Sequence, residues 1–129
     1  MKNFLTTAMI TAALASPLKG EEEDLVTVEQ FFNTCAIINT DLTEVSDFDF
    51  GMCIGIVKAI DQIGLMNCNS KRNYGHEIPI YLTADTDKVS YGALLQAMTN
   101  WAAEKPELWG QEVAYLILAV AEKFPCDID

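Results

Sequence analysis

Residues 52–68 read Met-Cys-Ile-Gly-Ile-Val-Lys-Ala-Ile-Asp-Gln-Ile-Gly-Leu-Met-Asn-Cys, and the predicted architecture is built around this stretch. Its apolar residues recur at intervals of three and four, the period of an amphipathic helix. Gly and Asn between positions 64 and 67 predict the end of this helix. Its inner face is predicted to carry Cys53, Ile56, Val57, Ile60, Ile63 and Gly64.

Two helices are predicted to follow this one, and one to precede it. Apolar residues between Val28 and Ile38 share one helical face, and Thr27 can cap that first helix, which ends near Thr40. The polar, acidic residues 41–49 connect it to the central helix. Asp85 or Thr86 can cap a third helix, whose inner face is made of Tyr91, Leu94, Leu95, Met98, Trp101 and Ala102.

The fourth helix is predicted from Pro106 to Phe124, because proline suits a first helical turn and Pro125 stops the helix. Its apolar face would hold Val113, Leu116, Ile117, Val120 and Phe124. Residues 69–85 are the longest stretch without a helical period, and we expect a loop there. The sequence therefore predicts an all-α fold, a small disulfide-bonded four-helix bundle.

The four cysteines can be paired from helix geometry. Cys53 and Cys68 flank the central helix, and fifteen residues of helix span about 22 Å. A disulfide needs Cα atoms within about 7 Å, so these two cannot pair across a continuous helix. Antiparallel neighbours bring Cys35 to Cys53, and they place Cys68 beside Cys126 at the ends of the second and fourth helices. We predict Cys35–Cys53 and Cys68–Cys126.

Composition narrows the class of protein. The chain has 129 residues, 8 Lys and Arg against 19 Asp and Glu, and a formal net charge of −11. With 50% hydrophobic residues, it is too apolar for intrinsic disorder. A nucleic acid is a poor partner for so acidic a chain, because phosphates require Lys and Arg.

The N-terminus resembles an export signal. Lys2 precedes an uncharged apolar stretch, Phe4 to Ala12, and Ala13-Leu14-Ala15 has the small-x-small pattern of a cleavage site. We expect a signal peptide at residues 1–15, a flexible acidic leader at 16–24 and one domain at 25–129. The even number of cysteines agrees with export. No apolar stretch reaches the roughly 20 residues of a membrane span, so none is expected.

Candidate chemistry is sparse in this sequence. The one histidine, His76, stands beside Glu77 and leaves an acid–base site open, although an exposed loop histidine is the simpler interpretation. Zinc spacings such as C-x-x-C are absent from the sequence, and a calcium or phosphate loop is absent too, so we predict no metal, no cofactor and no enzyme.

Two regions are candidates for binding a partner. Long loops in compact domains are often functional, and the 69–85 loop offers Arg72, Tyr74, His76, Glu77 and Tyr81. Nine acids and no base lie between Gly20 and Val57. That acidic segment is read either as a solvated face or as a docking surface for a basic partner.

The order of several short motifs resembles the Tai and Rap immunity proteins of type VI secretion systems, over residues 28–126. The resemblance rests on a cysteine in the first helix, a cysteine after the second, and three motifs: Met52-Cys53-Ile54-Gly55-Ile56-Val57, Lys105-Pro106-Glu107 and Phe124-Pro125-Cys126. Such proteins are small, helical and periplasmic, and they neutralise cell-wall amidase toxins.

The resemblance implies a periplasmic toxin inhibitor that occludes the active-site groove of a peptidoglycan amidase, and it implies a possible homodimer. The five loop residues named above would then contact the toxin. Three other interpretations stay open: a periplasmic stress chaperone that exposes apolar surface in acid, an odorant-type carrier, and an enzyme that uses His76. The carrier is disfavoured by the wide spacing of Cys68 and Cys126.

Overall fold

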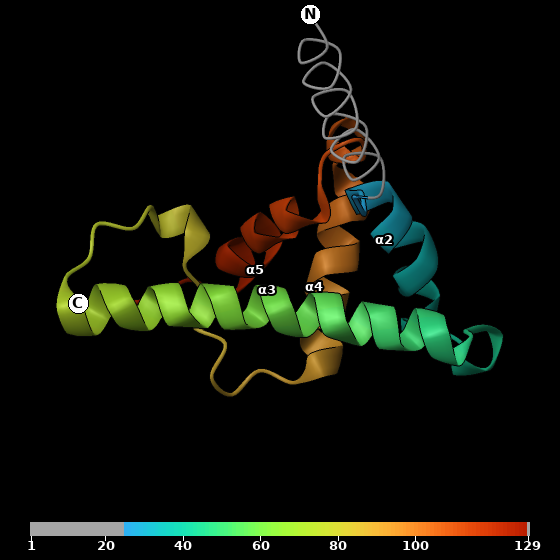
Figure 1. Ribbon diagram of the computed structural model, residues 1–129, viewed down its shortest axis with the longest axis horizontal. Helices are drawn as coiled ribbons and strands as arrows, with labels where there is room; N and C mark the ends of the chain where they lie inside the picture. Colours follow the sequence, from blue (N-terminus) through green and yellow to red (C-terminus); the bar gives the residue numbers. More distant parts are fainter. Residues whose placement is uncertain (1–24, 129) are drawn as a thin grey trace, which may run out of the picture.

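The computed structural model describes residues 25–128, and Figure 1 shows their arrangement. The predicted signal peptide and acidic leader lie outside the described residues. Four α-helices, α2 to α5, and several short 3-10 turns make up the described part, which contains two isolated β-bridges and no strand. Both predicted disulfides are present, and the prediction of a small disulfide-bonded all-α bundle is confirmed.

The longest element is α3 (Asp47–Tyr74), a 28-residue helix. Ser46 caps it, since its hydroxyl accepts a hydrogen bond from the Asp49 N–H at 3.1 Å. It ends at Gly75, whose left-handed backbone (φ 65°) is a common helix C-terminus. The predicted end between positions 64 and 67 is therefore wrong, and the first part of the predicted loop is helix.

Gly64 is buried in a close helix contact. A Cβ atom at this position would lie 3.0 Å from the Ala84 Cβ and 3.2 Å from the Ile117 Cδ1. The Gly64 carbonyl also accepts a hydrogen bond from the Ala84 N–H at 3.0 Å. Gly64 thus brings the segment before α4 against α3, and it does not terminate the helix.

We expect Gly64→Ala to lower the free energy of unfolding by about 1–3 kcal/mol relative to Gly51→Ala. Both substitutions gain helix propensity, but a Cβ at the exposed Gly51 meets nothing within 4 Å. Urea unfolding followed by circular dichroism compares the two variants. Equal stability of the two variants would show that Ala84 and Ile117 can move aside to admit a Cβ atom at position 64.

The remaining helices pack on α3 and on one another. Helix α2 (Val28–Cys35) contacts α3 and α4, and it begins with a capping box in which Thr27 and Gln30 exchange hydrogen bonds. Helix α4 (Tyr91–Glu104) passes behind α3 in Figure 1, and its first turn is capped by Ser90 and not by the predicted Asp85 or Thr86. The short α5 (Ile117–Lys123) contacts α3 and α4.

The predicted fourth helix is broken. Residues 106–124 form 3-10 turns at Pro106–Leu108 and Val113–Leu116 before α5 begins. The carbonyls of Trp109 and Gln111 accept hydrogen bonds from the Glu29 and Val28 N–H groups, at 3.1 and 2.9 Å. The first N–H groups of a helix have no partner within it, and here these two carbonyls accept their hydrogen bonds. The same carbonyls therefore do not accept the hydrogen bonds that a continuous helix over residues 106–124 would require.

The core is made of the faces that the helical period predicts, with one exception. Its buried side chains include Phe31, Val57, Leu95, Met98 and Val120. Ile63, predicted on the inner face, is 53% exposed. It points to solvent because the buried residues of α3 follow a different stripe, Cys53, Val57, Ile60, Gly64 and Cys68.

Candidate binding surface

A projecting segment follows the C-terminal end of α3. We use this name for residues 75–82, which arch beside the end of the helix and return to the bundle, as Figure 1 shows in yellow. The segment contains the 3-10 turn Ile80–Leu82, which packs against α5 and α3. Beyond it, Thr83, Ala84 and Thr86 are buried, so the chain re-enters the core immediately after the segment.

Two side chains of α3 donate hydrogen bonds to the backbone of this segment. The Asn67 amide donates a hydrogen bond to the Leu82 carbonyl at 2.8 Å. The Lys71 ammonium donates to the Ile78 carbonyl. Since these donors stand on a regular helix, the path of the backbone between residues 78 and 82 is fixed at two points.

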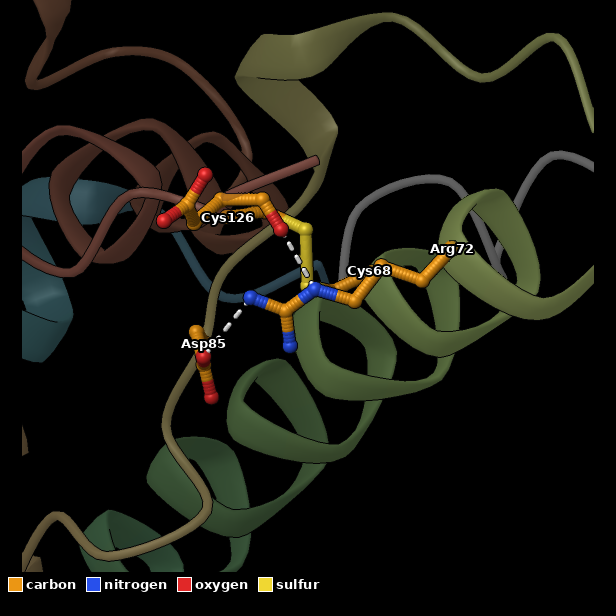
Figure 2. Close-up of polar contacts among 5 residues, drawn as sticks. Cys68, Arg72, Asp85 and Cys126 are labelled. Carbon is orange, nitrogen blue, oxygen red and sulfur yellow. Dashed lines mark hydrogen bonds and ion pairs between the residues drawn. A yellow bond between two sulfur atoms is a disulfide. The ribbon is translucent and has the colours of Figure 1, made fainter. Parts of the chain in front are cut away.

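A second set of contacts fixes the base of the segment to the C-terminus of the chain. Figure 2 shows the Arg72 guanidinium between Asp85 and the residues next to Cys126. Its Nη2 lies 2.9 Å from the Asp85 Oδ2, and its Nε donates to the Asp127 carbonyl. One turn earlier on α3, Cys68 is bonded to Cys126. A covalent bond and a charge-assisted hydrogen bond thus meet at the base of the segment.

The outer face of this region is apolar and aromatic. Tyr74 is 75% exposed, Tyr81 57% and Ile80 51%. The rings of Tyr74 and His76 stack with centroids 5.8 Å apart. Glu77 is exposed beside them. Large uncharged side chains that stay in water on a fixed backbone are typical of a protein-binding surface.

The structure separates the five residues predicted for binding into two groups. His76, Glu77 and Tyr81 lie in the projecting segment, as predicted. Arg72 and Tyr74 lie in the last turns of α3, so their predicted place in a loop is wrong. Arg72 also has a positioning role, because its guanidinium holds Asp85 and Asp127.

Ile80 belongs to the surface, although the sequence-based prediction omitted it. The signal was present in the apolar run Ile78-Pro79-Ile80-Tyr81-Leu82, which stands within a polar stretch.

Four acids of the acidic segment, Asp41, Glu44, Asp47 and Asp49, lie at the other end of α3. Residues 41–49 precede or open this helix, and 28 helical residues extend over about 42 Å. Its described acids are largely exposed. The Thr43 hydroxyl and N–H both donate to the Asp41 carboxylate, which lowers the pKa of Asp41. These four acids and the projecting segment therefore lie at opposite ends of α3 (Figure 1).

Outside the projecting segment, we also considered a hollow, a buried phenol and possible metal ligands. An open hollow of about 520 Å³ lies between α4 and α5, and none of the five predicted residues lines it. Burial raises the pKa of the Tyr91 phenol at the start of α4. Within residues 25–128, no group of three or more His, Cys, Asp or Glu side chains is placed to hold a metal ion.

Comparison with models of known protein families finds no match for this chain, and comparisons with curated proteins and with solved structures find none either. Among the described residues, no helix is both long and apolar enough to cross a membrane.

Proposed function

We propose that this protein is a periplasmic immunity protein that binds a peptidoglycan amidase toxin and occludes its active-site groove. The observation that carries the proposal is the projecting segment, which presents Tyr81 and Ile80 to solvent from a backbone fixed by α3 and by the Cys68–Cys126 disulfide. A rigid, exposed segment of this kind suits insertion into a concave site.

Rigidity matters because binding costs conformational entropy. A flexible loop would lose its freedom when it enters a groove, and that loss would weaken the complex. Here the hydrogen bonds from Asn67 and Lys71, and the Arg72–Asp85 ion pair, have already fixed the backbone in the free protein. Most of the contact energy is then available for the partner.

Occlusion is a function of shape and contact, so the segment needs no reactive group. Tyrosine is enriched among the residues that dominate interface energies, and Tyr81 and Tyr74 supply two within the same region. Two buried disulfides agree with an oxidising compartment, where an amidase that attacks the cell wall would also act.

The proposal is tested with an amidase encoded beside the gene for this protein. We expect the purified, oxidised protein to inhibit hydrolysis of isolated cell wall at a one-to-one ratio, and to compete with a soluble stem-peptide substrate. Co-export with the amidase should prevent lysis of the cells. A complex that leaves hydrolysis unchanged, or no binding to the amidase, would contradict occlusion.

A further inference from the structure

The hollow between α4 and α5 has the size of a small-ligand site, and the proposed function makes no use of it. Its volume is about 520 Å³, and sites for small ligands usually have volumes of about 300–1,000 Å³. One wall is a single face of α4, because its members recur at intervals of three and four. They are Ala93, Gln96, Ala97, Asn100, Trp101 and Glu104.

The hollow is open because α5 is much shorter than the helix it packs against. Helix α4 has 14 residues and extends over about 21 Å, whereas the 7 residues of α5 extend over about 10 Å. The chain before α5 lies against α2 instead, where the carbonyls of Trp109 and Gln111 accept hydrogen bonds from the first N–H groups of that helix. Part of the α4 face is therefore left without a helix over it.

Trp101 forms part of this wall and has an unmet hydrogen-bonding requirement. Its side chain is only 7% exposed, and its indole N–H is buried without a hydrogen-bond partner among the described residues. The indole N–H of Trp109, by contrast, donates to the Ala102 carbonyl at 2.7 Å. A buried tryptophan N–H usually finds an acceptor, and leaving it without one costs free energy.

An occupant that brings an oxygen atom to this wall can supply the missing acceptor. The Trp101 N–H is covered in the free protein, so a change of side-chain rotamer at the wall must accompany the new hydrogen bond. Such rotamer changes are common when a ligand or partner binds. Asn100 and Glu104, which stand beside Trp101 on α4, are exposed and can move.

Charged groups of both signs line the hollow. Glu104 lies on α4, and Glu122 and Lys123 lie on α5. All three are exposed, and none of them forms an ion pair within residues 25–128. A carboxylate attracts an amine and an ammonium group attracts a carboxylate, so the hollow is complementary to a molecule that carries both.

Two carboxamide side chains on the α4 wall offer the hydrogen bonds that a peptide group requires. The Gln96 Nε2 donates to the Asn100 Oδ1 at 2.9 Å. This bond leaves the Gln96 oxygen as an acceptor and the Asn100 amide as a donor. A peptide group presents the matching N–H and C=O. The small side chains of Ala93, Ala97 and Ala119 leave room for a backbone beside them.

We propose that the hollow between α4 and α5 binds a short zwitterionic peptide. Its amine lies beside the carboxylates of Glu104 and Glu122, its carboxylate lies beside Lys123, and one of its carbonyl oxygens accepts a hydrogen bond from the Trp101 indole. No residue of the projecting segment lines the hollow. The proposal therefore stands independently of the proposed function, and each can fail without the other.

Nuclear magnetic resonance of the indole N–H groups tests the proposal with an internal control. The chain has two tryptophans, so the spectrum of the ¹⁵N-labelled, oxidised protein has two indole signals, and Trp101→Phe identifies them. Trialanine should shift the Trp101 signal, because a new hydrogen bond forms there, and leave the Trp109 signal in place. We expect a dissociation constant of about 1 mM or below.

Two blocked peptides test the recognition of the charged ends. N-acetyl-trialanine has no amine, and trialanine amide has no carboxylate. Each should bind about tenfold more weakly than trialanine, the loss expected when one charge-assisted hydrogen bond is removed. Equal binding of the three peptides, no shift of the Trp101 signal at about 10 mM trialanine, or equal shifts of both indole signals would overturn the proposal.

A pair of matched double variants tests the carboxylates. Glu104→Gln with Glu122→Gln should weaken trialanine binding by about tenfold, because both carboxylates of the hollow are removed. Glu107→Gln with Glu112→Gln makes the same change in net charge at two exposed positions outside the hollow and should leave the binding unchanged. Circular dichroism checks that both variants are folded. Equal losses in the two variants would show attraction by the net charge of the protein and would refute a site between α4 and α5.

Discussion

Removing the Cys68–Cys126 disulfide by Cys68→Ala with Cys126→Ala should lower the free energy of unfolding by about 4 kcal/mol. The two cysteines are 58 positions apart, so the bond closes more than half of the described chain into a loop in the unfolded state. In the chain-entropy model, the stabilisation grows with the logarithm of the loop length. Guanidinium unfolding of the oxidised wild type and of the double variant measures the difference.

The second disulfide supplies the control. Cys35 and Cys53 are 18 positions apart, and the same model gives about 3 kcal/mol for their bond. Both pairs are buried, so the cost of removing sulfur from the core is similar. The two variants should differ more in their inhibition of the amidase than in their stability. Only the Cys68–Cys126 bond fixes the base of the projecting segment. If the Cys35–Cys53 variant loses inhibition to the same extent at a temperature where both are folded, the segment is not the binding surface.

The cysteine pairing was predictable because it depends on a long-range rule of geometry. A continuous helix keeps Cys53 and Cys68 apart whatever its exact ends are. The error in the position of the helix end did not affect this argument, since Cys68 lies within α3 and still meets Cys126. The inner face of α4 was predictable for a similar reason: five of its six predicted members are buried.

The end of α3 was missed because Gly64 has two possible meanings in a sequence. Glycine after an apolar run can stop a helix or allow a close contact, and the second applies here because Ala84 packs against it. A better stop signal lay further on. Lys71 and Arg72 in the last turn favour the negative end of the helix dipole, and Gly75 then takes the left-handed conformation.

The face occupied by Ile63 could not be predicted from periodicity alone. Exposed apolar side chains of α3, such as Phe48 and Met66, lie outside its buried face, and a helical period does not tell which apolar residues meet the core. The break in the predicted fourth helix has a comparable cause. The carbonyls of Trp109 and Gln111 bond to α2, which is distant in sequence, and no local pattern records that contact.

The strongest functional effect should come from Tyr81→Ala, which we expect to weaken amidase binding by about thirtyfold or more, the loss of a typical hot-spot residue. Tyr81 is 57% exposed on the Ile80–Leu82 turn, so its removal leaves the core untouched. Stability should change by no more than about 0.5 kcal/mol. Isothermal titration of the amidase with each variant gives the affinity, and thermal unfolding gives the stability.

Tyr115→Ala is the matched control for this experiment. Tyr115 is also exposed, at 42%, and it also lies in a 3-10 turn, Val113–Leu116, but that turn packs against α2 and α5. Both substitutions remove a tyrosine ring that is partly exposed in a 3-10 turn, so the comparison mainly tests the location of the ring. An affinity that falls for Tyr81→Ala and holds for Tyr115→Ala places the contact at the end of α3. Equal losses would mean that the amidase contacts both turns, and the projecting segment would then not be the element that fills the groove.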